Sequence, residues 1–147
     1  MQSVLDNLSK RRKMMFYILL SISSLGIFIN YFFDIPVTSY FTEENNIYIV
    51  YFLISYKVIE LGALYLFFYQ RHLHKLRSEI NNNELLEKFE KNAKRFFMLV
   101  PHGSTIFGMI SYKLTANIYI FLLFMLIASV ALYLVKPKHP HQDEVLK

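Results

Sequence analysis

Cysteine and tryptophan are absent from the 147 residues, and glycine and proline occur only four times each. Without cysteine the chain forms no disulfide, thiolate metal site, cysteine nucleophile or iron–sulfur cluster. The few glycines are scattered, so no Gly-rich phosphate loop or dinucleotide-binding fingerprint is present. We therefore expect no cofactor, no metal site and no catalytic group of these kinds.

The composition is too apolar for an ordinary soluble domain. Hydrophobic residues make up 54% of the chain and aromatic residues 17%, and the length is that of one domain. The formal charge of +5 raises the question of nucleic acid. No basic cluster is interleaved with a soluble fold that would present it, so nucleic-acid binding is not expected. The composition favours a small polytopic membrane protein.

Four segments have the apolar character of membrane spans, which need about 20 residues each. They are residues 14–33, 47–70, 96–112 and 116–135. The third segment is short and more polar, and it depends on pairing with the fourth through a turn at residues 113–115. We expect an all-α domain over residues 1–135 whose four transmembrane helices form two hairpins.

The positions of lysine and arginine predict the orientation. Nearly all of them fall in three segments, residues 10–13, 71–95 and 136–147, whereas the loop at residues 34–46 carries none. Basic residues that flank membrane spans are retained on the cytoplasmic side. Both termini are therefore expected in the cytoplasm, with residues 136–147 as a disordered tail.

Residues 71–95 predict a helical hairpin that continues the second and third spans into the cytoplasm. Apolar residues recur there at helical spacing on both sides of a turn and N-cap signal at residues 81–83. One interpretation is a solvated connector, and the other is a docking surface for a soluble cytoplasmic protein. The candidate partner surface consists of Leu73, Leu76, Lys88 and Lys91.

Lys57 and Glu60 are the sharpest feature, because they lie near the middle of the second span and three residues apart. That spacing puts them on one face of a helix. A charged side chain at the bilayer centre costs about 2.5 to 3.5 kcal/mol, so these two must pair, face the bundle interior or touch water. Three roles stay open: a structural ion pair, a site for protons, ions or polar solutes, and a contact with another subunit.

Helical rise predicts the neighbours of this pair. Folding the chain at about Asn82 places Glu60 at the depth of Ser104 and Lys57 at the depth of Phe107. His102 lies close to the depth of Glu60, which allows either a proton relay between them or a packing role for the imidazole. The candidate polar pathway consists of Lys57, Glu60, His102, Ser104, Thr105, Ser23 and Asn30.

Three functions remain open. A bundle of four helices encloses little volume, so a channel or transport-like protein would need several copies around an axis, and we expect a homo-oligomer. The second function is a non-catalytic membrane subunit or anchor whose cytoplasmic hairpin binds a soluble partner. The third is a lipid-modifying membrane enzyme with His102 and Glu60 as acid and base, although no nucleophile or metal set accompanies them. The expected partners are membrane lipids and further copies of the chain.

Overall fold

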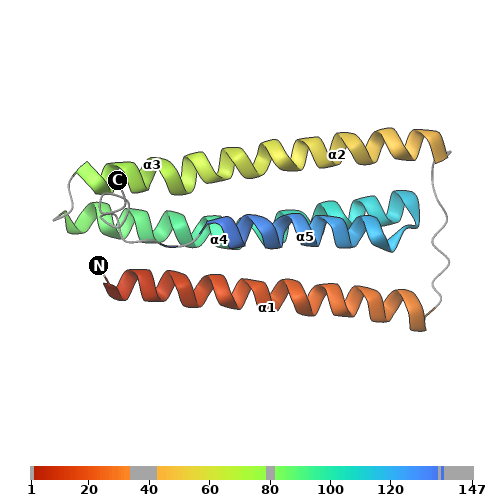
Figure 1. Cartoon of the computed structure of the whole chain (residues 1–147), viewed down its shortest axis with the longest axis horizontal. Coiled ribbons are helices and arrows are strands. Elements are labelled where there is room, and N and C mark those ends of the chain that lie inside the picture. Colours follow the sequence, from red (N-terminus) through yellow and green to blue (C-terminus); the bar gives the residue numbers. More distant parts are fainter. Residues whose placement is uncertain (1, 34–42, 79–81, 136, 138–147) are drawn as a thin grey trace.

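The computed structural model describes residues 2–33, 43–78, 82–135 and 137, and all regular structure in these ranges is helical. The elements are α1 (Gln2–Phe32), α2 (Glu43–Leu64), the π-helix η1 (Tyr65–Gln70), α3 (Arg71–Ser78), α4 (Asn83–Thr115) and α5 (Ile118–Leu134). Because α2, η1 and α3 follow one another directly, the chain forms four long helical rods (Figure 1). Apart from Pro137, the tail expected at residues 136–147 lies outside the described residues.

The long helix α4 occupies the centre of the molecule. Its C-terminal half packs against α5, and the helix packs against α1 on one side and against α2, η1 and α3 on the other. Figure 1 shows α1 and α2 on opposite sides of α4 and α5, and these two outer helices do not contact each other. The first of the two expected hairpins is therefore not a packed pair. The reason is that α4 and α5 supply the closely packed faces, and each outer helix docks on them separately.

Phe121 of α5 joins three helices at a point where two glycines leave room for its ring. A β-carbon placed on Gly26 of α1 would lie 2.8 Å from the ring, and one placed on Gly108 of α4 would lie 2.9 Å from it. Both distances are shorter than normal carbon–carbon contact. The small side chains therefore let α1 and α4 approach α5 closely, as small residues do in membrane helix packing.

Helix α1 begins at Gln2, well before the expected first span at residue 14. Leu8, Met15 and Leu19 are buried at helical spacing, so one apolar stripe continues through the basic run at residues 10–13. The sequence analysis did not include this helical extension. It places the basic residues on a rigid helix beside α4 and α5.

The turn between α4 and α5 lies slightly later than the sequence indicated. Helix α4 runs to Thr115, and Ala116 has a φ of 55°, in the left-handed region that commonly ends a helix. The Asn117 side chain then accepts a hydrogen bond of 2.9 Å from the Tyr119 amide and caps α5. Ala116 and Asn117 thus make the tight turn that was expected at residues 113–115.

Two helical stretches, Gln2–Phe32 and Asn45–Leu76, are long and apolar enough to cross a membrane, and only 11% of the most apolar window of each is buried. Helix α5 is strongly apolar but has 17 residues. Large hydrophobic side chains are exposed on all of the long helices, for example Phe32, Ile59, Ile106 and Leu134.

Candidate functional site

Lys57 and Glu60 form an ion pair on the face of α2 that packs against α4. The distance between Lys57 Nζ and Glu60 Oε2 is 2.7 Å. The Lys57 side chain is fully buried, whereas 27% of the Glu60 side chain is exposed. The ammonium is therefore shielded, and the carboxylate can still be reached from outside the chain.

Gly103 of α4 makes room for this pair. A β-carbon placed on Gly103 would lie 2.7 Å from Lys57 Nζ and 3.1 Å from Glu60 Oε1. Any larger residue would push the ammonium out of its position, so the pair depends on a glycine in the facing helix. A glycine inside an otherwise apolar helix is the signal that points to such a close approach.

The ring of Phe107 covers the buried ammonium. Lys57 Nζ lies 5.4 Å from the ring centroid, which is within the range of a cation–π interaction. The same ring packs against Tyr56 of α2 at 5.6 Å and against Phe124 of α5 at 6.2 Å, measured between centroids. Phe107 is the neighbour that folding the chain at Asn82 predicts. It connects the ion pair to α2, α4 and α5.

His102 and Ser104 flank Gly103 in sequence, but neither contacts the pair. The His102 ring is exposed, and its Nδ1 lies 2.7 Å from the Met98 carbonyl oxygen of its own helix. Ser104 is fully buried, and its hydroxyl has no hydrogen-bond partner. Each residue along a helix turns by about 100°, so with Gly103 facing α2 its two neighbours point elsewhere. Of the two roles left open for His102, the structure shows a hydrogen bond within its own helix and no hydrogen bond to Glu60.

The other polar residues of the predicted pathway make separate hydrogen bonds, two of them within one helix and one between α1 and α4. The Ser23 hydroxyl donates to the Leu19 carbonyl at 2.8 Å within α1, and the Thr105 hydroxyl donates to the Pro101 carbonyl at 2.9 Å within α4. Asn30 accepts a 2.7 Å hydrogen bond from the Tyr112 hydroxyl. These contacts lie on different faces and at different heights, so the described part of the chain brings no continuous polar route together.

The helical hairpin predicted at residues 71–95 uses its apolar residues internally. Leu76 is fully buried, and Leu73 is partly buried against the same core. These two members of the predicted partner surface therefore face α4 rather than solvent. Lys88 and Lys91 remain exposed, and Lys88 pairs with Glu84 one turn earlier. The Lys88 ammonium holds the pKa of the Glu84 carboxyl below its usual value.

Aromatic side chains pack η1 against α4. This contact lies where the backbone changes from α-helix to π-helix. Tyr69 of η1 is buried, and its ring lies 5.6 Å from Phe89, 6.2 Å from Phe96 and 6.3 Å from Phe97. The Arg71 amide bonds to the Leu66 carbonyl five residues earlier, as the π-helix requires. Helix α3, which follows η1 directly, also packs against α4, and its Leu76 is buried. No sequence pattern indicated the π-helix.

Apolar grooves lie on the outer surface where the outer helices meet α5. One, of about 500 Å³, lies between α2 and α5 and includes Val58, Gly62 and Leu134. Another, of about 370 Å³, lies between α1 and α5. Within the described ranges, no group of three or more His, Asp or Glu side chains is placed to hold a metal ion. Comparison with known protein families, curated proteins and solved structures gave no match.

Proposed function

We propose that the protein is an integral membrane protein with four spans that handles protons, small ions or polar solutes as a homo-oligomer. The Lys57–Glu60 pair carries this proposal. It joins a fully buried ammonium to a partly exposed carboxylate near the middle of a helix that is long enough to span a membrane. Ionisable groups inside a span are expensive, and they commonly mark ion or proton pathways.

The exposed surface supports insertion into a membrane. The core helix of a soluble protein is mostly buried, whereas α1 and the α2–α3 rod expose most of their apolar windows. Helix α5, with 17 residues, is about 26 Å long, near the short limit for a span. Helix α5 packs against α4 along its own length, so the two helices would cross the membrane as a pair. The distribution of basic residues then places both termini in the cytoplasm.

The dispersed polar residues support an assembly of several copies. Because the described helices enclose no continuous polar route, a path for ions would have to lie between chains. The exposed part of Glu60 would face lipid in a single chain, at a cost of about 2.5 to 3.5 kcal/mol for a charge at the bilayer centre. Water or another copy at this surface would offset that cost. We therefore place Glu60 at the contact between copies.

The test is flux of protons and small ions across liposomes that contain the purified protein, wild type beside Glu60→Gln. The matched control is Glu87→Gln, which removes an exposed carboxylate from the hairpin part of α4. We expect the flux to change in Glu60→Gln alone, while the oligomeric mass in detergent stays the same. A folded wild type that passes no ion under any gradient would overturn the proposal.

A second candidate function is binding of a soluble protein by the hairpin. It is favoured by the rigid aromatic packing around Tyr69, which presents Lys88 and Lys91 from a fixed support. Because the leucines face inward, such a partner would have to be acidic rather than apolar. Charge reversal at both lysines should then abolish partner binding, and Glu60→Gln should leave it intact.

A further inference from the structure

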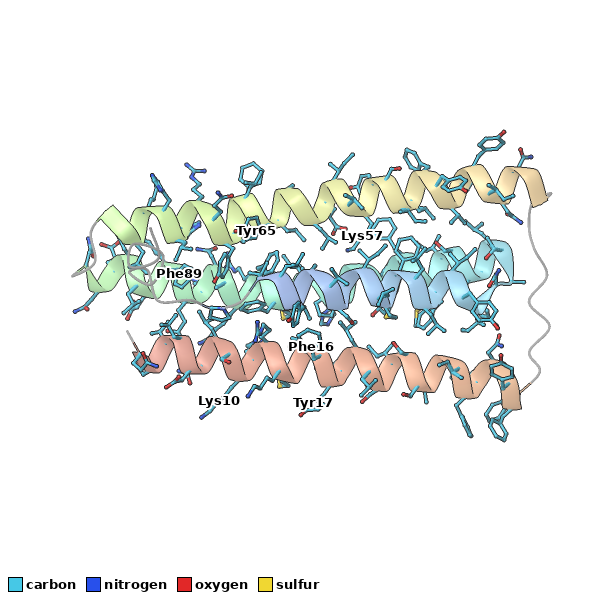
Figure 2. The ribbon with its side chains drawn as sticks, in the orientation of Figure 1. Lys10, Phe16, Tyr17, Lys57, Tyr65 and Phe89 are labelled. Carbon is cyan, nitrogen blue, oxygen red and sulfur yellow. The ribbon has the colours of Figure 1, made fainter. Side chains whose placement is uncertain are left out.

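The groove between α1 and α5 is an elongated apolar surface on the outside of the molecule. Its lining includes Phe16, Leu19 and Ser23 of α1 and Leu122, Met125 and Ser129 of α5. Both serine hydroxyls donate to carbonyls of their own helices, Ser23 to Leu19 and Ser129 to Met125. Tyr17 also lines the groove, and apart from its hydroxyl the groove offers carbon surface to a ligand. Figure 2 shows Phe16 pointing from α1 toward α5 and α4.

Two basic residues stand at one end of this groove. Arg12 and Lys13 precede Phe16 and Tyr17 by one helical turn, so they lie above the groove on the same side of α1. Nε and Nη1 of Arg12, like Nε of Arg11, are buried within the protein and have no hydrogen-bond partner. Lys13 is exposed. Lys10 belongs to the same basic run but points away from the other helices (Figure 2).

The Arg12 guanidinium has no acceptor within the protein, and its third nitrogen, Nη2, is not buried, so this nitrogen can reach an anion at the surface. A buried donor without an acceptor loses its hydration and gains nothing in return, and the loss is larger for charged groups. A phosphate oxygen can accept a charge-assisted hydrogen bond from Nη2. The adjacent exposed ammonium adds a second positive charge at the same place.

We propose that Arg12 and Lys13 bind the phosphate of one anionic phospholipid, whose acyl chain lies in the groove between α1 and α5. The proposal rests on the membrane insertion proposed above but not on ion transport. In the expected orientation the basic run lies at the cytoplasmic surface, the depth at which lipid phosphates are found. A phospholipid is favoured over a free anion because the apolar groove continues directly from the basic end.

The experiment measures the lipid that stays bound to the full chain purified from vesicles of equal parts phosphatidylglycerol and phosphatidylcholine. Native mass spectrometry counts each lipid, and the two share the same acyl chains. We expect phosphatidylglycerol to be retained preferentially. Arg12→Gln should lower its retention roughly fivefold, in line with one basic residue near an anionic surface. Lys10→Gln is the matched control and should retain the lipid as the wild type does.

A second variant tests the groove without changing any charge. Ser129→Phe fills the space with a ring, and we expect it to lower retention while Arg12 remains in place. Equal retention of the two lipids, or unchanged retention in Arg12→Gln, would overturn the inference. Inorganic phosphate that raises the melting temperature as much as phosphatidylglycerol would also overturn it, because the acyl chain would then contribute nothing.

Alkaline extraction of the vesicles separates this inference from the proposed function. A chain that resists extraction but binds no phospholipid selectively would refute the lipid site and leave the membrane protein standing. A chain that alkali releases would refute insertion itself, and the lipid site with it. Arg12→Lys keeps the charge and should recover part of the retention, which shows that loss in Arg12→Gln does not come from misfolding.

Discussion

At the scale of single residues, Gly103 decides how closely α2 and α4 can approach at the ion pair. Its absent side chain leaves the space that the Lys57 ammonium occupies. Gly62 of α2 provides a contrast, because a β-carbon there would meet nothing within 4 Å. A glycine-to-alanine change therefore tests a close contact at Gly103 and an open surface at Gly62.

We expect Gly103→Ala to be less stable than Gly62→Ala by about 1 kcal/mol, because the added methyl group would displace Lys57 Nζ, the flexible end of its side chain, from the carboxylate and from the Phe107 ring. Gly62→Ala should raise stability by up to about 1 kcal/mol, since alanine has the higher helix propensity and its β-carbon meets nothing there. Thermal unfolding in detergent, followed by circular dichroism, measures both variants. Equal melting temperatures for the two variants would show that the pair does not depend on this contact.

The ion pair also predicts what happens to Glu60 when Lys57 is replaced. Lys57→Met removes the ammonium and leaves the Glu60 carboxylate without its partner, which should cost about 3 kcal/mol or more. Adding Glu60→Gln removes the unpaired charge, so the double variant should be more stable than Lys57→Met alone. The measurement is a double-mutant cycle on the melting transition. Additive losses would contradict direct coupling between these side chains.

At the scale of elements, the start of α4 is defined by one side chain. The Asn82 side chain accepts hydrogen bonds from the amides of Glu84 at 3.0 Å and Leu85 at 3.3 Å. The asparagine run at residues 81–83 predicted an N-cap here, and the cap at Asn82 confirms it. An N-cap can be predicted from the sequence because the capping residue and the amides it binds are neighbours in the chain.

Asn82→Ala should destabilise the hairpin by about 1 kcal/mol, because two amides at the start of α4 lose their acceptor. Asn83→Ala is the control, since Asn83 is exposed inside the first turn and caps nothing in the structure. Hydrogen exchange of the amides at residues 84–86 gives the readout. Exchange that is equally slow in both variants would argue against the cap.

At the scale of the whole molecule, the arrangement puts the hairpin at one end and the start of α2 at the other (Figure 1). The proposed orientation therefore predicts opposite accessibility for exposed residues at these two ends. The natural absence of cysteine makes this measurable with single substitutions and no background.

We expect Lys91→Cys to react with a membrane-impermeant maleimide only when the cytoplasmic face is open, and Asn45→Cys to react from the outside of intact cells. Both residues are exposed in the structure. The reason is the positive-inside distribution of the basic residues. Labelling of both sites from the same side would show that the helices do not cross the membrane as proposed.

Much of the element structure could be predicted because its signals are local. Apolar length, helical periodicity, the N-cap at Asn82 and the spacing of Lys57 and Glu60 all refer to residues close together in the chain, and helical rise alone brought Phe107 to Lys57. For the candidate site, only the position of its residues along the helix axes could be predicted. Its orientation around the axis of α4 selects Gly103 rather than His102 or Ser104, and that rotation depends on contacts with three other helices.

The sequence by itself determined that the described part of the chain is helical, and it placed Lys57 and Glu60 on one face of a helix that is long enough to span a membrane. It predicted four spans, and two of the four helical rods in the structure are long and apolar enough to cross a membrane. Only the tertiary structure decided that α1 and α2 lie apart on either side of α4 and α5, and that Leu73 and Leu76 face inward. The physical reason lies in the composition of the long helices. They are apolar on most sides, so the choice of contact face depends on shape, on where Gly26, Gly103 and Gly108 leave room, and not on the hydrophobic pattern.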